Sequence, residues 1–352
     1  MKKLILSIGA VALMVAVAVT AAVAKTAASA DVCVLLPDTK SSVRWEQFDR
    51  PDIAAALKKA GVTYTITNAL GDAQKQKSQA DQCLSNGAKV IIIVNVDPAS
   101  AAAIQKDAAA KGAKSIDYDR QTIGGSAVAY VSFDGGSVGA IQGKGLIAGL
   151  KANGMYSKKP VIAELNGGKT DSNAFLFKKG YDSILNPLYK NGTFVKGPDQ
   201  FVPGWLATNA QPIFDQMLLK TNNKIDGAIA ANDNIAGAVI ASLKSKKLKP
   251  IALTGQDGSI GGAQNILSGW QSMTVYKPVP LEAAAVAKVA VQVLKGQKIT
   301  GINASFPNGS KKEPALLIPV ISVTKANVNR LFTDKFLKKS DVCVGEYKKY
   351  CK

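Results

Sequence analysis

The chain of 352 residues has a formal net charge of +19 and no His, and 40 of its 44 basic residues are Lys while only four are Arg. Base recognition favours the rigid fork of Arg, and these lysines are spread along the chain without interleaved aromatic residues, so we expect a lysine-rich solvated surface and no nucleic-acid partner. The absence of His removes the commonest general base and a common metal ligand, which argues against nucleophilic catalysis and against a metal site.

The first thirty residues are typical of an export signal. Lys2 and Lys3 precede an uncharged run from 4 to 24, and the small residues 28–30 suit a cleavage site before Asp31. We therefore expect residues 1–30 to be a signal peptide and the protein to be exported, either to the periplasm or to the extracellular cell surface. The uncharged run is also long enough to span a bilayer, so an uncleaved anchor is the alternative.

Strand-like apolar runs then alternate with helix-like segments. In the first half the expected strands are 32–36, 63–67, 90–94 and 114–118, and the expected helices are 51–60, 73–85 and 99–111. In the second half the expected strands are 161–165, 194–197, 225–231 and 251–254, and the expected helices are 173–185, 209–219 and 234–244. This alternation predicts right-handed βαβ units and a parallel sheet in each of two lobes, an α/β architecture.

Three segments are expected to connect the lobes. They are a strand at 127–133, a strand at 271–276 followed by a helix at 281–294, and a crossing near 306–314 that returns through 316–323. Three crossings form a hinge, so the lobes should move as rigid bodies around a cleft. We assign residues 31–133 plus 278–305 to an N-terminal lobe and residues 134–277 plus 306–352 to a C-terminal lobe.

Four cysteines in an exported chain favour two disulfides, for which three pairings exist. Cys343 and Cys351 are close enough for a local loop, whereas Cys33 opens the first strand and Cys83 lies in the expected helix 73–85. We favour Cys33–Cys83 and Cys343–Cys351. A metal site is the alternative, but the chain has no CxxC spacing and no His.

Polar side chains gather where several of the expected strands end. They are Asn95 and Asp97, Asp119-Arg120, Asn232-Asp233-Asn234 and Gln256-Asp257. Since ligands bind at the carboxyl ends of the strands in an open parallel sheet, this pattern predicts a site for a small polar ligand. We interpret Asn95 and Asp97 as turn and cap residues.

The Gly-rich stretch 139–145 suggests a nucleotide site, but it is one residue short of a P-loop and has Gly where Ser or Thr must hold magnesium. A helix packed closely on a sheet explains it better. No GxSxG elbow is present, although a carboxylate pair among Asp119, Asp233 and Asp257 leaves a glycoside hydrolase as an alternative. We expect a binding protein without enzymatic activity and without a cofactor.

The scarce Arg and Trp residues indicate a sugar. Arg44 has Trp45 beside it, and Arg120 has Asp119 beside it. Planar forks and carboxylates each engage two adjacent hydroxyl groups, and an aromatic face covers the C–H face of a pyranose. Trp205 offers a second aromatic face from the other lobe.

A series of short motifs occurs in order between about residues 31 and 323. They are Val43-Arg44-Trp45-Glu46, Tyr118-Asp119-Arg120, Ser132-Phe133-Asp134, Asp171-Ser172-Asn173-Ala174, Gly204-Trp205-Leu206, Asn222-Asn223-Lys224-Ile225-Asp226, Ala231-Asn232-Asp233, Gly255-Gln256-Asp257 and Met273-Thr274-Val275-Tyr276-Lys277-Pro278. With these motifs the chain resembles the type I periplasmic sugar-binding protein family of ABC importers, and within it the D-xylose-binding members.

The resemblance implies two Rossmann-like three-layer α/β/α lobes with parallel sheets, joined by a three-segment hinge, with a monosaccharide enclosed between them. It implies Trp45 and Trp205 on the faces of the sugar. It also implies that the polar contacts come from Arg44, Asp119, Arg120, Asn173, Asn232, Asp257 and Lys277, with Asp171 at a further polar position of the pocket.

Several positions depart from the family pattern. Residues 166–170 read Asn-Gly-Gly-Lys-Thr where the family has a proline-containing turn, Pro203 replaces an acidic residue, and residues 36–40 replace the family's acidic pair. The four cysteines and the chain beyond Arg330 also lie outside the pattern.

We expect a monomer that binds a pentose, with D-xylose the first candidate, by hinge closure and delivers it to a membrane permease. The alternatives are a carrier of another pentose or hexose, a sugar-sensing protein for a chemoreceptor and, with less support, the glycoside hydrolase. A transcriptional repressor of the same fold would carry a helix-turn-helix where this chain has its export signal.

Overall fold

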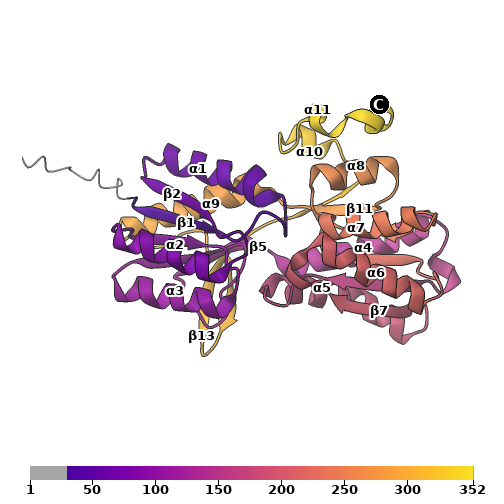
Figure 1. Ribbon diagram of the computed structural model, residues 1–352, viewed down its shortest axis with the longest axis horizontal. Coiled ribbons are helices and arrows are strands. Elements are labelled where there is room, and N and C mark those ends of the chain that lie inside the picture. The colour runs from indigo at the N-terminus through magenta and orange to yellow at the C-terminus, as the bar shows by residue number, and fades with distance from the viewer. Residues whose placement is uncertain (1–29, 352) are drawn as a thin grey trace, which may run out of the picture.

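The computed structural model describes residues 30–351, so the expected signal peptide lies outside the described residues apart from Ala30. Two α/β lobes lie end to end along the long axis of the molecule (Figure 1). Within the described range no helix combines the length and the apolar character that a membrane span requires. The two lobes with mostly parallel sheets confirm the expected fold class.

The first lobe is built on one seven-stranded sheet with the order β12-β13-β5-β4-β3-β1-β2. Its strands are β1 (Val32–Leu36), β2 (Tyr64–Asn68), β3 (Val90–Ile93), β4 (Lys114–Tyr118), β5 (Ala129–Phe133), β12 (Ala304–Asn308) and β13 (Lys311–Ile318). Neighbouring strands are parallel except for the β12–β13 pair. Because β1 and β3 are buried throughout, they are continuous apolar runs without polar alternation.

Helices cover both faces of this sheet. Helices α1 (Arg50–Lys59) and α9 (Val279–Leu294) share one apolar core with the strands, and α2 (Ala73–Ser85) and α3 (Pro98–Ala110) share another. Helix α9 follows in sequence after most of the second lobe, so the chain returns to complete the first lobe. The two cores make the expected three-layer arrangement.

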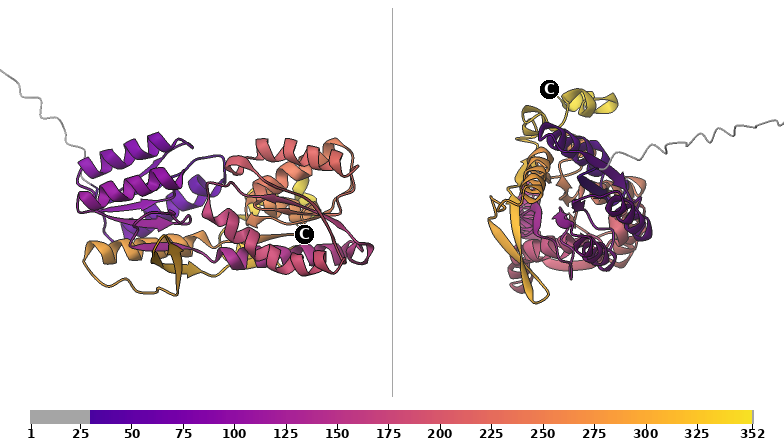
Figure 2. Two further views of the ribbon diagram at one scale, coloured as in Figure 1. Left: turned by 90° about the horizontal axis from the view of Figure 1, so that it is seen from below. Right: turned by 90° about the vertical axis from the view of Figure 1, so that its left-hand side faces the viewer.

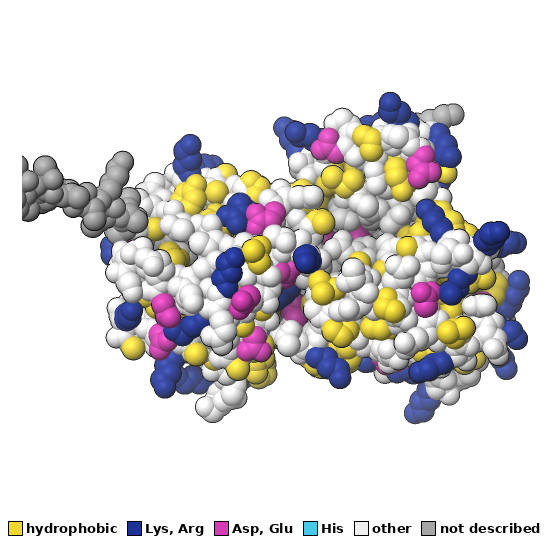
Figure 3. Space-filling model, viewed as in Figure 1, with side chains coloured by type: hydrophobic (Ala, Val, Ile, Leu, Met, Phe, Trp, Pro, Cys, Tyr) yellow, Lys and Arg dark blue, Asp and Glu magenta, His cyan; other side chains and the backbone are white. Residues whose placement is uncertain are grey.

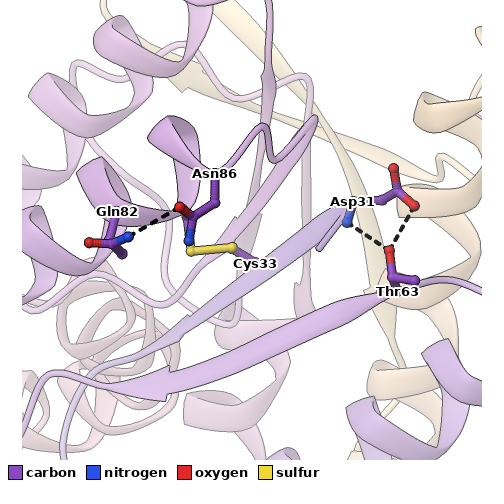
Figure 4. Close-up of a disulfide and its surroundings, with 6 residues drawn as sticks. Asp31, Cys33, Thr63, Gln82 and Asn86 are labelled. Carbon is purple, nitrogen blue, oxygen red and sulfur yellow. Dashed lines mark hydrogen bonds between the residues drawn. A yellow bond between two sulfur atoms is a disulfide. The ribbon is translucent and has the colours of Figure 1, made fainter. Parts of the chain in front are cut away.

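A disulfide ties the first lobe's sheet to its outer helices. Cys33 of β1 is bonded to Cys83 of α2, as the sequence analysis favoured. Figure 4 shows this bridge near the start of β1, where the Asp31 amide donates to the Thr63 hydroxyl, which in turn donates to the Asp31 carboxylate. Both half-cystines are nearly inaccessible to solvent.

The second lobe contains a parallel sheet with the order β7-β6-β8-β9 and a smaller sheet with the order β10-β11-β14. The strands are β6 (Val161–Asn166), β7 (Val195–Phe201), β8 (Gly227–Ala230), β9 (Ala252–Leu253), β10 (Gln256–Asp257), β11 (Met273–Tyr276) and β14 (Ile321–Thr324). Its helices are α4 (Gly135–Ala152), α5 (Ser172–Lys190), α6 (Ala207–Lys220), α7 (Asp233–Ser245) and α8 (Ile260–Ser268). Helices α4 and α5 pack together, as do α6 and α7, on either side of the sheet (Figure 2).

The Gly-rich stretch forms the helix that the sequence analysis preferred to a nucleotide loop. Gly145 faces Met273 of β11, as expected for packing on a sheet, and other glycines face α5. A Cβ atom on Gly139 would lie 1.9 Å from the carbonyl oxygen of Phe177, and one on Gly180 would lie 2.4 Å from that of Gly136. These glycines therefore let two helices approach backbone to backbone. The approach holds α5, which begins at the cleft, tightly on α4.

The sequence analysis predicted that the chain crosses to the second lobe near residues 306–314, and this prediction is wrong. These residues belong to an antiparallel hairpin, β12–β13, in which Asn308 pairs with Lys311 across a two-residue loop that begins at Gly309 (φ +61°). Strand β13 pairs with β5, so residues 304–318 extend the first sheet, although the sequence analysis assigned residues from 306 onward to the C-terminal lobe. A two-residue loop of Gly-Ser is a hairpin signal that the sequence analysis did not use. The chain crosses to the second lobe between Ile318 and β14.

The chain ends in a compact segment, which we call the tail (residues 325–351). It contains α10 (Arg330–Thr333), α11 (Lys339–Val342) and the 3-10 helix η4 (Gly345–Tyr350). Cys343 and Cys351 are bonded, so both favoured disulfides are present. The tail lies over α8 of the second lobe (Figure 1).

Candidate functional site

A small cavity lies between the lobes. Its walls are made by Ser41, Ser42, Arg44, Trp45, Asp119, Arg120, Asp171, Asn173, Phe177, Trp205, Asn232, Gln256, Asp257 and Lys277. The structure thus brings together around one space all ten residues that the sequence analysis expected to contact a ligand. Acidic and basic side chains are visible where the two lobes meet (Figure 3).

Arg44 is buried and is held by three carboxylates. Its Nε and Nη2 donate to the two oxygens of Asp49 at 2.8 and 2.6 Å, Nη2 donates to Glu282 at 2.6 Å, and Nη1 donates to Asp119 at 2.6 Å. Burial alone would lower the pKa of Arg44, but these carboxylates raise it well above its usual value. Four of the five guanidinium N–H groups are committed, so one N–H of Nη1 is left for a ligand.

Asp49 and Glu282 were not singled out by the sequence analysis. Asp49 closes the short π-helix η1 (Trp45–Asp49), and Glu282 is a fully buried carboxyl on the Ala/Val-rich α9. Burial raises the pKa of Glu282 well above its usual value, although Arg44 opposes the shift. The only acidic residue of an Ala/Val-rich helix was the available sequence signal.

Asp119 joins the two halves of the site. Its carboxylate accepts from Arg44 and lies 3.4 Å from the ammonium of Lys277, while Asn173 Nδ2 donates to its backbone carbonyl at 2.8 Å. Burial would raise the pKa of Asp119, but Lys277, Arg44 and Arg120 together lower it to about 2. The carboxylate is therefore ionised and suited to accept hydrogen bonds.

Arg120 extends across the cleft and is held by residues of both lobes. Its Nε lies 2.9 Å from the Asp171 carboxylate of the second lobe, and its Nη1 donates to the Asn95 carbonyl at 3.1 Å. Asn95 is buried, and its amide donates to the carbonyls of Arg120 and Gln121, so it positions Arg120. Asp97 caps α3, as expected.

Trp45 is packed between cations. The guanidinium carbons of Arg44 and Arg120 lie 4.7 and 5.3 Å from the indole centroid, and the indole N–H donates to Ser41 Oγ at 3.1 Å. Cation–π contacts of this kind stabilise a fixed ring orientation. Trp45 is 2% exposed, so its ring forms a rigid wall of the cavity.

Trp205 forms another aromatic wall and depends on a glycine pair. A Cβ atom on Gly167 would lie 2.1 Å from the indole, and one on Gly168 would lie 3.1 Å from it. The Asn-Gly-Gly-Lys-Thr departure from the family pattern therefore makes room for this ring, which packs edge-on against Phe177. The indole N–H of Trp205 is buried and finds no acceptor within residues 30–351, so a ligand oxygen could accept from it.

Three cavity residues have left-handed backbone conformations that non-glycine residues rarely adopt. They are Asp119 (φ +58°), Trp205 (φ +61°) and Asp257 (φ +102°). Such conformations cost about 1–3 kcal/mol each and cluster at functional sites. Their concentration here supports a binding role for the cavity.

Several contacts already join the lobes in this closed arrangement. Asn232 Nδ2 donates to the Ser41 carbonyl at 3.0 Å while its Oδ1 caps α7, and Lys277 Nζ lies 3.4 Å from Asp119 Oδ2. Lys277 Nζ also lies 3.2 Å from Asp257 Oδ1 within the second lobe. The four cavity residues that the sequence analysis did not propose as ligands are Ser41, Ser42, Phe177 and Gln256. Three of them lie within three residues of a proposed ligand residue, and Phe177 follows Asn173 by one helical turn.

Asp233 lies behind the cavity and holds the loop that carries Asp257. Its carboxylate accepts from the amide and the hydroxyl of Ser259, from Gln271 Nε2 and from Thr274 Oγ1, at distances of 2.8–3.0 Å. Burial is the main cause that raises the pKa of Asp233 to about 6. Asn234 does not line the cavity, and its amide donates to the Lys40 carbonyl at 3.4 Å.

Among residues 30–351, no group of three or more Asp, Glu or Cys side chains is arranged to hold a metal ion. The cavity walls carry three cations, Arg44, Arg120 and Lys277, and three carboxylates, Asp119, Asp171 and Asp257. The formal charges of the lining cancel. The site is thus rich in hydrogen-bonding groups without a net excess of either sign.

Comparison with known proteins gives one consistent family. The periplasmic binding protein domain family matches residues 32–298. The D-xylose-binding periplasmic protein of Escherichia coli (strain K12) is 33% identical over 301 residues, which cover 85% of this chain and 88% of that protein. A carbohydrate transporter solute-binding protein from Chloroflexus aurantiacus, solved with D-glucose, superposes with a TM-score of 0.80 at 29% identity and covers 89% of this chain and 98% of that one.

A second solved structure also shares this fold over most of the chain. An ABC transporter solute-binding protein from Clostridium phytofermentans, with bound β-D-glucose, superposes with a TM-score of 0.82 at 27% identity over 88% of this chain and 99% of that one.

Proposed function

The chain belongs to the type I periplasmic sugar-binding protein family, and from that premise we propose that it is the exported solute-binding protein of an ABC importer for a neutral monosaccharide, with D-xylose as the first candidate. The observation that carries this proposal is the cavity between the lobes, where two indoles stand among three cations and three carboxylates. Aromatic faces pack on the C–H faces of a sugar, and forks and carboxylates pair with its hydroxyl groups.

The charge of the cavity lining supports an uncharged sugar. Since the charges of the lining cancel, an anionic sugar acid or a cationic amino sugar would bring in an unpaired charge, which is costly in a buried site. A neutral pentose or hexose brings only hydroxyl groups and a ring oxygen.

The choice of D-xylose rests on the relatives. The Escherichia coli protein that is 33% identical over 85% of this chain is named for D-xylose, whereas the two structures described above contain glucose. The 33% identity to the D-xylose-binding protein is higher than the 29% and 27% identities to the two proteins solved with glucose. D-glucose is therefore the principal competitor in any test.

The mechanism is a shift between open and closed forms. The sugar contacts come from both lobes, with Arg44 and Asp119 on one side and Trp205 and Asp257 on the other, so they are all made only in the closed form. A ligand shifts the equilibrium by the difference in its affinity for the two forms. The closed form would then be the one that the membrane permease receives.

No chemical step is assigned to the site. The relatives are solute-binding proteins, and the lowered pKa of Asp119 suits acceptance of hydrogen bonds rather than donation of a proton to a leaving group. We therefore propose a binding protein and not an enzyme.

Isothermal titration calorimetry tests this proposal with a matched panel of D-xylose, D-glucose, D-glucuronate and D-glucosamine. We expect saturable binding of D-xylose and much weaker binding of the two charged sugars. Tighter binding of D-glucose than of D-xylose would move the assignment to a hexose carrier. Preferential binding of either charged sugar would contradict the neutral-ligand proposal.

A further inference from the structure

The tail has no part in the cavity, and the family match ends at residue 298, well before it. Nevertheless the tail is a compact unit of three short helices that is closed by the Cys343–Cys351 disulfide. Its position relative to the two lobes is therefore informative.

The tail is docked on the second lobe. Leu331, Leu337 and Val342 are buried in one apolar cluster with Ile266 and Leu267 of α8. A hydrogen bond adds to this contact, since Gln264 Nε2 of α8 donates to the Val342 carbonyl at 3.0 Å. The tail should consequently move with the second lobe as one body.

The tail also contacts the first lobe, through Phe336. Phe336 is 6% exposed, and its ring lies 4.4 Å from that of Phe48 in a stacked arrangement and 4.7 Å from that of Tyr276. Phe48 belongs to η1 of the first lobe, whereas Tyr276 belongs to β11 of the second lobe. Phe336 is thus packed between an aromatic ring of each lobe.

Both partners of Phe336 are adjacent in sequence to residues of the site. Phe48 precedes Asp49, which holds Arg44 by two hydrogen bonds. Tyr276 precedes Lys277, which lies between two carboxylates of the cavity at 3.4 and 3.2 Å. The contacts among these three rings therefore connect η1, which carries Trp45 and Asp49, to β11, which Lys277 follows directly.

From this geometry we infer that Phe336 is a positioning residue of the sugar site, which holds η1 of the first lobe against the second lobe in the closed form. The inference rests on the proposed function. In this proposal, opening of the cleft moves η1 away from a tail that moves with the second lobe, and the Phe48–Phe336 contact is then lost. A contact of this kind raises the closed population and slows release of the sugar.

The test uses the full-length protein with D-xylose as the probe and stopped-flow tryptophan emission as the readout. Phe48→Ala and Phe336→Ala should each raise koff by about 3- to 10-fold, the range expected for loss of one aromatic pair. The double variant should release sugar no faster than the faster single variant, because both substitutions remove the same contact. Association rates should change less than dissociation rates.

Phe332→Ala is the matched control. Phe332 is another tail phenylalanine that packs against the same apolar cluster, and among residues 30–351 no ring of the first lobe is within stacking distance of it. Its koff should stay within twofold of wild type. An equal effect of Phe332→Ala and Phe336→Ala would mean that tail docking in general matters, and would overturn the specific role of Phe336.

A second arm needs no sugar. Small-angle scattering of the ligand-free protein should give a larger radius of gyration for Phe48→Ala and Phe336→Ala than for wild type and Phe332→Ala. If wild type does not bind D-xylose or D-glucose, the proposed function fails, and this arm alone decides the inference. Unchanged koff and unchanged scattering in both variants, or strictly additive effects in the double variant, would overturn it.

Discussion

Ser42 Oγ donates a 2.8 Å hydrogen bond to Asp257 Oδ2, and both residues are buried. Ser42 lies on the loop after β1 in the first lobe, whereas Asp257 belongs to β10 in the second lobe. The bond spans 215 positions of sequence and joins the two lobes at the wall of the cavity. The closed form is thus stabilised by direct contacts of its own, to which a ligand adds.

Replacement Ser42→Ala should therefore weaken sugar binding by shifting the equilibrium toward the open form. A hydrogen bond to a charged group contributes roughly 1.5–3 kcal/mol, which corresponds to a loss in affinity of about tenfold or more. Calorimetric titration with D-xylose measures this loss. Ser245→Ala, an exposed serine away from the cavity, serves as the control, and equal affinities of the two variants would contradict the assigned role of Ser42.

Replacement Asp119→Asn should nearly abolish binding. The variant keeps the shape of the side chain but leaves Arg44 and Lys277 without their shared carboxylate, and loss of one partner from a buried charge pair costs about 2–5 kcal/mol. We expect at least ~30-fold weaker binding of D-xylose in a protein whose circular dichroism spectrum is unchanged. Wild-type affinity in this variant would place the binding site elsewhere.

Replacement Gly167→Ala tests the packing of the Trp205 indole against the backbone at Gly167. The new Cβ atom would lie 2.1 Å from the indole, so the ring must move, and the shape of the cavity must change with it. Gly168→Ala is the matched control, because its Cβ atom would lie 3.1 Å away and the ring needs to move only slightly. We expect a large loss of sugar affinity for Gly167→Ala and a small one for Gly168→Ala. The reverse order would refute the proposed packing.

The raised pKa of Asp233 predicts that the free energy of unfolding depends on pH. Its pKa is raised by burial to about 6 in the folded protein, against about 3.9 for an unperturbed Asp, so the folded state binds more protons between these values. The stability that this group contributes is therefore fully present at pH below about 4 and is lost as pH rises through about 6, by up to ~3 kcal/mol.

The difference in free energy of unfolding between wild type and Asp233→Asn isolates this contribution. Because Asn does not titrate, wild type should lose stability relative to the variant as pH is raised from 4 to 7. Urea denaturation at intervals of half a pH unit measures the difference. A difference that does not change with pH would mean that Asp233 titrates normally in the folded protein.

Much of the site follows from local sequence signals. Asp119, Arg120, Asn232 and Asp257 each lie shortly after the end of an apolar run, and buried parallel strands end at the edge of the sheet where ligands bind. The scarcity of Arg and Trp made Arg44, Trp45 and Trp205 conspicuous. The family motifs then supplied Asp171, Asn173 and Lys277, which have no distinctive local pattern.

The features that were not predicted depend on contacts between elements that lie far apart in the sequence. Glu282 bonds to Arg44 across 238 positions, because α9 returns to the first lobe after the second lobe has formed. The fit of Trp205 to Gly167 and the contact of Phe336 with Phe48 likewise arise only when separate segments pack. The third crossing was misplaced because residues 306–314 were interpreted as the crossing and residues 316–323 as the return to the second lobe. Residues 304–318 instead form a hairpin whose second strand pairs with β5.

The most direct test of the central proposal is a titration of wild-type protein with D-xylose, followed by tryptophan emission. Trp45 and Trp205 both line the cavity, so occupation and closure should change their environment. We predict a saturable change in emission with micromolar or tighter affinity, absent in Asp119→Asn. A flat titration of folded protein with D-xylose, other pentoses and hexoses would contradict the assignment of this cavity as a sugar site.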